Sequence, residues 1–340
     1  MNQRSVRNIS LKKYSQVATD LGIDQLRMFR QVGLESSWLQ ASEIRVPETN
    51  FAHLLQTTSS AADNASIGLL MGALWKLSDF GYLSLVLQHQ ASLGQAIATI
   101  SEYSHLLSST ISVNVVRQNK VAIIQLHLTT GREQPGRHPV ELGVAVLQAL
   151  CRHQLGCNWC SISTHFTHEA PISMVQHRRI FGSDMVFDSD FDGLVLSCAD
   201  LDQIHPAYDE SMEQYARHFL DTMVPVSARP DIGQQVRLAI QALLPHGCYS
   251  IAQVASTIGF STRSLQRNLE SSGTSFQLAL NAVRMQTATR ALKNPRLSIS
   301  DVALQTGFAE NSSFTRWFNT EFQQSPSHWR TLNFASVAVN

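Results

Sequence analysis

A segment near the C-terminal end of the chain occurs twice, and this internal repeat constrains the fold more than any other feature of the sequence. Five apolar or glycine positions of the first copy recur 48 residues later. They are Ile251, Val254, Ala255, Gly259 and Phe260 in the first copy, and Ile299, Val302, Ala303, Gly307 and Phe308 in the second. Five matches at one offset indicate a duplicated supersecondary unit.

Each copy predicts a helix, a short glycine turn and a second helix. In the first copy Ser250 is the expected N-cap, and the apolar residues that follow it have helical spacing. Gly259 follows the last of them, where helices commonly end with a positive φ. Ser261 can then cap a second helix that buries Leu265 and Leu269. This order is typical of a helix-turn-helix unit.

The second copy has the same order, with one more residue in its turn. Asp301 lies in the first turn of its first helix, where the helix dipole favours an acidic side chain. Phe314 and Phe318 are expected on the buried side of its second helix.

The segment between the copies, residues 275–292, predicts one helix with Phe276, Leu280, Val283, Ala288 and Leu292 as its buried positions. Such a spacer is about 26 Å long, which suits two recognition helices held about 34 Å, or one turn of DNA, apart. Residues 226–340 hold 10 Lys and Arg against 5 Asp and Glu, whereas residues 1–225 hold 16 against 21. A basic segment with two helix-turn-helix units predicts DNA binding in two adjacent major grooves.

Residues 233–332 resemble the DNA-binding domain of the AraC/XylS family of bacterial transcription regulators. The resemblance rests on the two repeated segments and on flanking residues: Ser261, Leu265, Arg267, Leu269, Gly273, Phe276, Arg284, Phe314, Arg316, Phe318, Ser325, Pro326, Trp329 and Arg330. The chain departs from the family where Gln323 replaces a glycine and Trp329 a tyrosine. Asn319 and Thr320 also stand where the family usually has Lys or Arg.

The exposed positions of each second helix are the candidates for reading bases, as the same positions are in the family. Arginine can bridge two acceptors of guanine, and Asn or Gln can pair with the adenine edge. The base-reading candidates are Arg263, Gln266, Arg267, Asn311, Ser312, Thr315 and Arg316. The phosphate-contact candidates are Ser261, Thr262, Ser264 and Ser298. Contacts with phosphates position a protein on DNA without specifying the sequence.

Residues 1–221 predict a mixed domain. Helical periodicity occurs at 13–33, 50–72, 92–108, 138–155 and 209–221, and strand-like stretches at 80–88, 111–117, 120–129, 160–166, 185–188 and 194–197. Residues 112–117 and 120–128 predict a hairpin that turns at Gln118-Asn119. The expected architecture is an α+β N-terminal sensor domain, then a proline-containing linker at 222–232, then an all-α C-terminal domain with two helix-turn-helix units joined by a long helix, and a tail at 333–340.

The N-terminal domain is similar to the arabinose-binding-like domain of one AraC-family branch, found in ornithine-utilisation and virulence regulators. The segments that carry the similarity include 67–72, 80–83, 92–96, 103–108, 168–171, 179–182 and 194–196. The resemblance implies an effector-binding domain, a dimerisation domain, or both. Trp75, Glu102, Tyr103 and His105 are candidates for lining an effector pocket, although a structural role is commoner for each residue type.

The resemblance implies double-stranded DNA, a small-molecule effector of unknown identity, RNA polymerase and a second copy of the chain as partners. Activation is the commoner mode in the family. No catalytic residue and no cofactor is expected, and we found no phosphate-binding loop, GxSxG or HExxH motif.

Two alternatives remain open. Cys157 and Cys160, with His165 and His168 nearby, invite a zinc or redox interpretation, and AraC-type units also occur fused to cysteine methyl acceptors of DNA repair. The other alternative is a regulator with no small-molecule ligand. The chain has five cysteines, no apolar run of about 18 residues and no signal peptide, so we expect a cytoplasmic protein without a membrane span.

Overall fold

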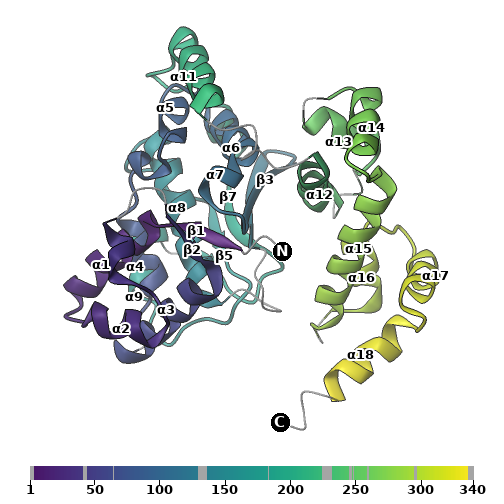
Figure 1. Cartoon of the computed structure of the whole chain (residues 1–340), viewed down its shortest axis with the longest axis horizontal. Coiled ribbons are helices and arrows are strands. Elements are labelled where there is room, and N and C mark those ends of the chain that lie inside the picture. The colour runs from purple at the N-terminus through teal and green to yellow at the C-terminus, as the bar shows by residue number, and fades with distance from the viewer. Residues whose placement is uncertain are drawn as a thin grey trace. The chain divides into compact units, whose positions relative to one another are not determined.

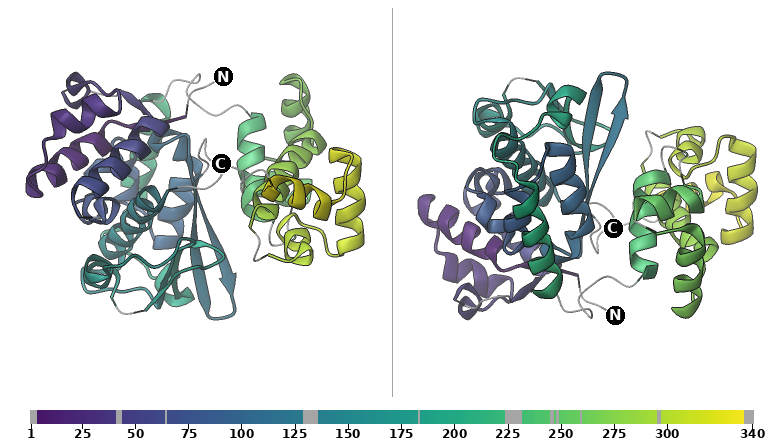
Figure 2. Two further views of the ribbon diagram at one scale, coloured as in Figure 1. Left: turned by 90° about the horizontal axis from the view of Figure 1, so that it is seen from below. Right: turned by 90° about the horizontal axis from the view of Figure 1, so that it is seen from above.

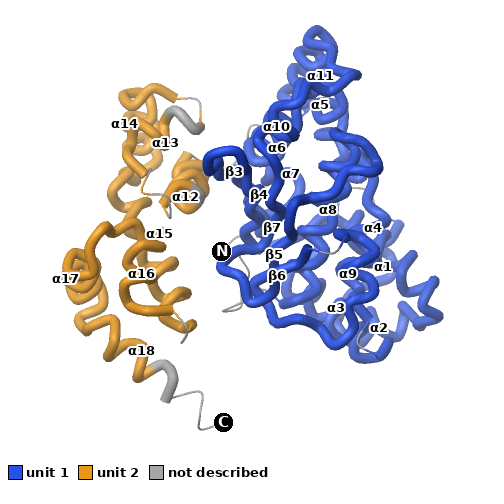
Figure 3. Tube along the Cα trace, turned by 180° about the vertical axis from the view of Figure 1, so that it is seen from behind, with its two compact units in different colours: residues 1–228 blue, residues 229–340 orange. Residues whose placement is uncertain are grey.

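The computed structural model describes residues 4–40, 44–63, 65–128, 136–182, 184–223, 232–244, 247, 249–258, 260–294 and 297–335. The chain divides into two compact units, residues 1–228 and residues 229–340 (Figure 3). Most of the linker predicted at 222–232 and the first turn glycine, Gly259, lie outside the described residues.

The N-terminal unit begins with a helical layer around its own apolar core. The layer contains α1 (Ile9–Asp20), α2 (Gln25–Gln31), the short 3-10 helix η1 (Ser36–Leu39), α3 (Glu48–Ala61) and α4 (Ile67–Ala73). Strands β1 (Ser5–Arg7) and β2 (Arg45–Pro47) form a small antiparallel sheet beside it. The helical stretches predicted at 13–33 and 50–72 are therefore two helices each. Tyr14, Phe29 and Phe51 are among the side chains that fill this core.

A five-stranded sheet forms the second part of this unit, with strand order β3-β4-β7-β5-β6. Its strands are β3 (Ile111–Gln118), β4 (Val121–Leu128), β5 (Ser163–His165), β6 (Met185–Val186) and β7 (Asp192–Ser197). The predicted hairpin is confirmed as the antiparallel β3–β4 pair at one edge of the sheet (Figure 2). Its turn lies one residue later than predicted, at Asn119-Lys120, and Asn119 adopts a φ of 55°.

The long helix α8 (Arg137–Leu155) joins the helical layer to the sheet, since it packs against α4, β4 and β7 (Figure 1). Helix α4 approaches it closely: a Cβ on Gly68 would lie 2.0 Å from the His138 carbonyl oxygen, and one on Gly72 2.4 Å from the Ala145 Cβ. The conspicuous glycines of residues 67–72 thus have a packing role.

The remaining helices of the unit are α5 (Leu83–Leu87), α6 (Leu93–Glu102), α7 (Ser104–Leu107), α9 (Val175–Phe181), α10 (Cys198–Asp202) and α11 (Glu210–Met223), with the 3-10 helix η2 (Leu77–Phe80). The strand predicted at 80–88 is wrong. Residues 77–80 and 83–87 are helical, because Leu83, Val86 and Leu87 have the spacing of one buried helix face.

The C-terminal unit is all helical, as predicted. It contains α12 (Ile232–Leu243), α13 (Ile251–Thr257), α14 (Thr262–Ser271), α15 (Phe276–Leu292), α16 (Ile299–Gln305), α17 (Asn311–Phe322) and α18 (Pro326–Ala335). Helix α15 lies between the α13–α14 pair and the α16–α17 pair (Figure 1). Leu280 and Val283 of α15 belong to the core of the first pair, and Ala288 and Leu292 to the core of the second. Each helix-turn-helix unit therefore has its own core, and α15 contributes to both.

Candidate functional site

The first candidate surface is the exposed side of α14. The Ser261 hydroxyl accepts a hydrogen bond from the Ser264 backbone N–H at 3.2 Å, so the predicted cap starts this helix. Leu265 and Leu269 are fully buried beneath it. Each of the three base-reading candidates of this copy, Arg263, Gln266 and Arg267, is exposed. The helix thus presents two guanidinium groups and one amide to solvent over an apolar base.

The second candidate surface is the exposed side of α17. Phe314 and Phe318 are fully buried, as predicted, and anchor the helix in an aromatic cluster with Phe308 and Trp317. The base-reading candidates of this copy are Asn311, Ser312 and Arg316, which are exposed, and Thr315, which is half-buried. The Ser312 hydroxyl donates to Glu310 at 3.2 Å, and that of Thr315 lies 3.4 Å from the Asn311 side-chain oxygen. Arg316 is the long cationic side chain among the four.

The phosphate-contact candidates lie at the amino ends of helices. Ser298 and Asp301 form a reciprocal cap, with the Ser298 hydroxyl donating to the Asp301 carboxylate at 2.6 Å. Hydrogen bonds from the hydroxyl and the backbone N–H of Ser298 lower the pKa of Asp301. The Ser261 hydroxyl donates to that of Ser264 at 2.9 Å, while Thr262 is half-buried beside them. The Ser261 and Ser298 hydroxyls are therefore engaged in capping the helices that follow them.

A polar and aromatic contact joins the two helix-turn-helix units. The Arg284 guanidinium lies over the rings of Tyr249, at 4.8 Å, and Phe308, at 4.3 Å, and its Nε donates to the Thr306 carbonyl at 3.2 Å. The Tyr249 hydroxyl donates to the Gly307 carbonyl at 2.7 Å. Because Tyr249 precedes the first unit and the turn at 306–308 belongs to the second, this contact fixes one unit against the other. The sequence marked Arg284 only through the family resemblance and gave no signal for Tyr249.

The departures from the family pattern leave the fold intact. Gln323, which replaces a glycine, still adopts the left-handed conformation, with a φ of 56°, at the end of α17. A non-glycine residue there costs some backbone strain. Trp329 packs edge-on against Phe318 in the core of the second unit.

In the N-terminal unit, one of the four effector candidates lines a cavity and three do not. Glu102 forms an ion pair with Arg217 at 2.9 Å, and the Tyr103 hydroxyl donates to Asp221 at 3.0 Å. Burial, the Glu102 charge and the bond to Asp221 raise the pKa of Tyr103 to about 12. His105 is half-buried beside the Tyr103 ring. The bonds made by Glu102 and Tyr103 tie the end of α6 to α11.

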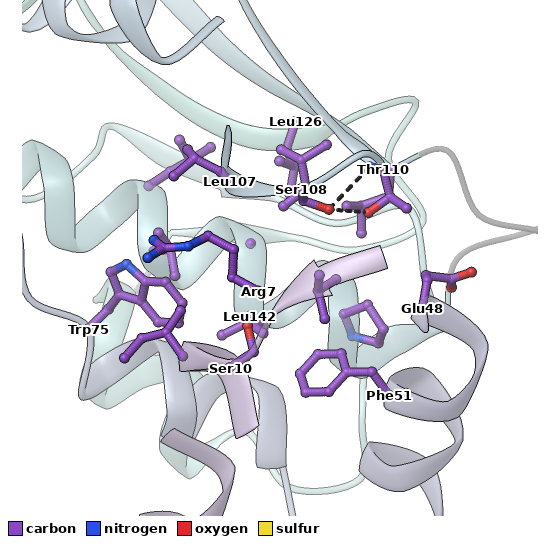
Figure 4. A pocket seen from close by; sticks show the side chains of 18 of the residues that line it. Arg7, Ser10, Glu48, Phe51, Trp75, Leu107, Ser108, Thr110, Leu126 and Leu142 are labelled. Carbon is purple, nitrogen blue, oxygen red and sulfur yellow. Dashed lines mark hydrogen bonds between the residues drawn. The ribbon is translucent and has the colours of Figure 1, made fainter. Parts of the chain in front are cut away.

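Trp75 lines a partly enclosed cavity of about 120 Å³ between the helical layer and the sheet (Figure 4). Apolar side chains dominate its walls, and Arg7, Glu48 and Asp79 also contribute to them. The Trp75 indole nitrogen is buried and has no hydrogen-bond partner among the described residues. Sequence reasoning missed the other wall residues, because they come from segments spread between residues 6 and 147.

The cysteine cluster does not assemble into a ligand set in the described part of the chain. Cys157 and Cys160 are exposed and free. His165 stacks on Phe191 and bonds to the Ser163 and Ser189 hydroxyls instead. Among the described residues, no three His, Cys, Asp or Glu side chains lie close enough to hold a metal ion. No described helix is long and apolar enough to cross a membrane.

Comparison with known proteins agrees with this architecture. Residues 22–204 match the model of the arabinose-binding domain of AraC transcription regulators, N-terminal, and residues 254–331 match a helix-turn-helix domain. The chain is 23% identical over 328 residues to the ornithine utilization regulator of Pseudomonas aeruginosa, covering 93% of this chain and 95% of that protein.

A second relative is the transcriptional regulator VirS of Mycobacterium tuberculosis. This chain is 21% identical to it over 336 residues, and the match covers 97% of this chain and 98% of VirS. Among solved structures, the regulator CdpR of Pseudomonas aeruginosa is 20% identical, with a TM-score of 0.44, and the match covers 90% of this chain and 97% of that one.

Proposed function

Since the chain belongs to the AraC family of DNA-binding transcription regulators and has its arabinose-binding type of N-terminal domain, we propose that it activates transcription by reading two adjacent major grooves, under the control of a small-molecule effector held by residues 1–221. The observation that carries the proposal is the pair of exposed polar faces on α14 and α17. Each face stands on its own apolar core, and the contact around Arg284 holds the two units together.

The two faces have different chemistry, which predicts unequal contributions to specificity. In α14, Arg263 and Arg267 can each form a bidentate contact with guanine, and Gln266 can pair with adenine. In α17, Arg316 is the one long cation among the base-reading candidates, and Asn311 is the candidate for adenine. Thr262, Ser264 and the capped helix ends at Ser261 and Ser298 position the domain on phosphates.

Footprinting of the full chain and two variants on one selected site tests this proposal. Arg263→Ala and Arg316→Ala each remove a base contact, at a cost of about 1–3 kcal/mol, and relax specificity at one base position. We expect each variant to weaken protection of one half-site only, with the larger loss for Arg263→Ala. Equal loss in both half-sites for both variants would contradict the assignment of one helix to each groove.

We also propose that the chain acts as a homodimer through α11. Met212, Tyr215, Phe219 and Met223 are exposed and follow one another at intervals of three or four residues, which places them on one face of the helix. A stripe of this kind suits a second copy of the same helix. Sedimentation of the full chain should give a dimer, and Tyr215→Asp should shift it to monomer. A wild-type monomer at micromolar concentration would refute this part.

Activation implies contact with RNA polymerase. Activation is measured by transcription in vitro from a promoter that carries the selected site, with purified polymerase and the full chain. We expect transcript to increase with added chain, whereas a decrease would identify a repressor.

A further inference from the structure

The two helix-turn-helix units have separate apolar cores on one shared helix. No described apolar residue belongs to both cores, and α15 supplies Leu280 and Val283 to the first and Ala288 and Leu292 to the second. With 17 residues, α15 is about 26 Å long. The helix therefore sets the distance between the two units. Because long helices bend, the angle between the units also depends on contacts that lie away from the helix axis.

Arg284 makes such a contact, because its guanidinium lies between one aromatic ring of each core. The guanidinium carbon is 4.8 Å from the centre of the Tyr249 ring, which packs on the first core. It is 4.3 Å from the centre of the Phe308 ring, which packs on the second core. The Arg284 Nε also donates a hydrogen bond to the Thr306 carbonyl, 3.2 Å away. One side chain from the middle of α15 thus holds the turn that leads to α17.

Two more hydrogen bonds join the units beside Arg284. The Tyr249 hydroxyl donates to the Gly307 carbonyl at 2.7 Å, and the Trp317 indole nitrogen of α17 donates to the Asn281 side-chain oxygen of α15 at 2.7 Å. Hydrogen bonds weaken steeply when their angles change. This junction, made by Tyr249, Asn281, Arg284, Trp317 and residues 306–308, therefore favours one arrangement of the two units.

The charge of Arg284 is held without an acidic partner. Arg284 is half-buried, and among the described residues no Asp or Glu forms an ion pair with it. The two rings and the Thr306 carbonyl take the place of a carboxylate. Replacing Arg284 thus leaves no buried carboxylate without its counter-charge. A variant without the guanidinium should keep both cores.

We propose that Arg284 is a positioning residue that fixes the spacing of the DNA site, so that the chain takes DNA whose two blocks lie one set number of base pairs apart. The inference rests on the proposed reading of two grooves. One added base pair moves a block by about 3.4 Å along the DNA axis and turns it by about 35° around that axis. While the junction is closed, α14 and α17 cannot both follow such a change. Once it is open, bending of α15 lets them follow it in part.

A series of DNA sites tests this inference. The sites keep the two selected blocks and differ by one base pair removed or added between them. The wild-type full chain should bind the selected spacing most tightly. Arg284→Met should lower the ratio between the selected and the altered spacings by about three- to tenfold. The junction cannot resist more strain than the free energy of its own hydrogen bond and cation–π contacts.

Two further variants separate the junction from a general effect of charge. Arg290→Met removes a positive charge from the same helix, but Arg290 is exposed and lies outside the junction, so the ratio should not change. Arg284→Lys keeps the charge but loses the Nε donor and the planar group that stacks on the rings, so it should relax the spacing as well. It also carries the test if Arg284→Met does not fold.

A second measurement needs no DNA. Spin labels are placed with a non-natural amino acid at Glu270 of α14 and Thr320 of α17, which are exposed. Pulsed electron resonance on the full chain then gives the distribution of distances between the two helices. We expect a broader distribution in both Arg284 variants than in the wild-type chain or in Arg290→Met.

Failure of this inference and failure of the proposed function have different signatures. An unchanged ratio in the Arg284 variants, or a loss of affinity by the same factor at every spacing, would overturn the inference even if the wild-type chain reads its site. If the wild-type chain has no sequence-specific binding, the proposed function fails, and the claim about spacing falls with it. Label distances of equal width in all variants would then overturn the role of Arg284 in holding the units as well.

Discussion

Gly307, in the turn of the second helix-turn-helix unit, provides a sharp test of how the two units are held together. Its φ is 76°, a region that costs an L-residue about 1–2 kcal/mol. A Cβ there would also lie 2.7 Å from the Tyr249 ring and 2.8 Å from the Leu244 side chain. Crowding of this kind adds about 1–3 kcal/mol. Gly307→Ala should therefore destabilise the second helix-turn-helix unit by about 2–5 kcal/mol, and it should push the Tyr249 hydroxyl away from its hydrogen bond to the Gly307 carbonyl.

Gly273 offers a matched control in the same domain. Its φ is 70°, but a Cβ there would meet nothing within 4 Å. Gly273→Ala should cost only the conformational term, about 1–2 kcal/mol.

Hydrogen exchange of the α16 and α17 amides, measured on the full-length chain, reports the local stability of the second unit. We expect protection there to fall by roughly tenfold for each 1.4 kcal/mol lost in Gly307→Ala, together with a weaker affinity for a two-block DNA site. Gly273→Ala should leave protection in α16 and α17 nearly unchanged. The same loss of protection in α16 and α17 for both variants would refute the reasoning, because crowding against Tyr249 would then have no role.

Two further predictions concern the N-terminal unit. Gly68→Ala places a Cβ 2.0 Å from the His138 carbonyl oxygen and should destabilise the unit by about 1–3 kcal/mol in urea unfolding; wild-type stability would show that α4 and α8 can separate without cost. Burial raises the pKa of Glu141, but the contacts with His138, His177 and Arg137 lower it by more, so that its net pKa is about 2 instead of 4.5. As the pH falls, the unfolded chain therefore takes up a proton at Glu141 before the folded chain does. The stabilisation that the ionised Glu141 contributes is complete above about pH 4.5 and is lost as the pH falls toward 2. Glu141→Gln should lower stability at pH 7 and flatten its decline in acid, and an unchanged acid profile would contradict the ion-pair account.

The C-terminal fold was predictable because its signals are local. These signals include the caps Ser261 and Ser298, the turn before Phe308 and the buried pair Phe314 and Phe318. Each signal depends only on residues a few positions away in the chain, and the duplicated unit shows the same pattern twice. The contact of Arg284 with Tyr249 was not predictable, because it joins residues whose spacing only the tertiary fold sets.

The N-terminal unit was predicted in class but not in every element. The run at 80–88 is short and apolar, and such a run does not distinguish a strand from a buried helix. Gly81, with a φ of 65°, ends the 3-10 helix at residues 77–80, and α5 begins after it at Leu83. The Arg7 guanidinium packs against Gly81. The cavity is assembled from distant segments, so Trp75 was found by residue type, while Phe51, Leu126 and Leu142 had no signal.

We propose above that two helix-turn-helix units of one chain read two adjacent grooves at specific sequences. Capture of fragmented genomic DNA by the full chain, followed by sequencing, tests this proposal. We expect enrichment of a few sites that share two conserved blocks about one helical turn, or 10–10.5 base pairs, apart. Recovery of fragments with no common sequence, with and without a ligand that stabilises the N-terminal unit, would contradict it.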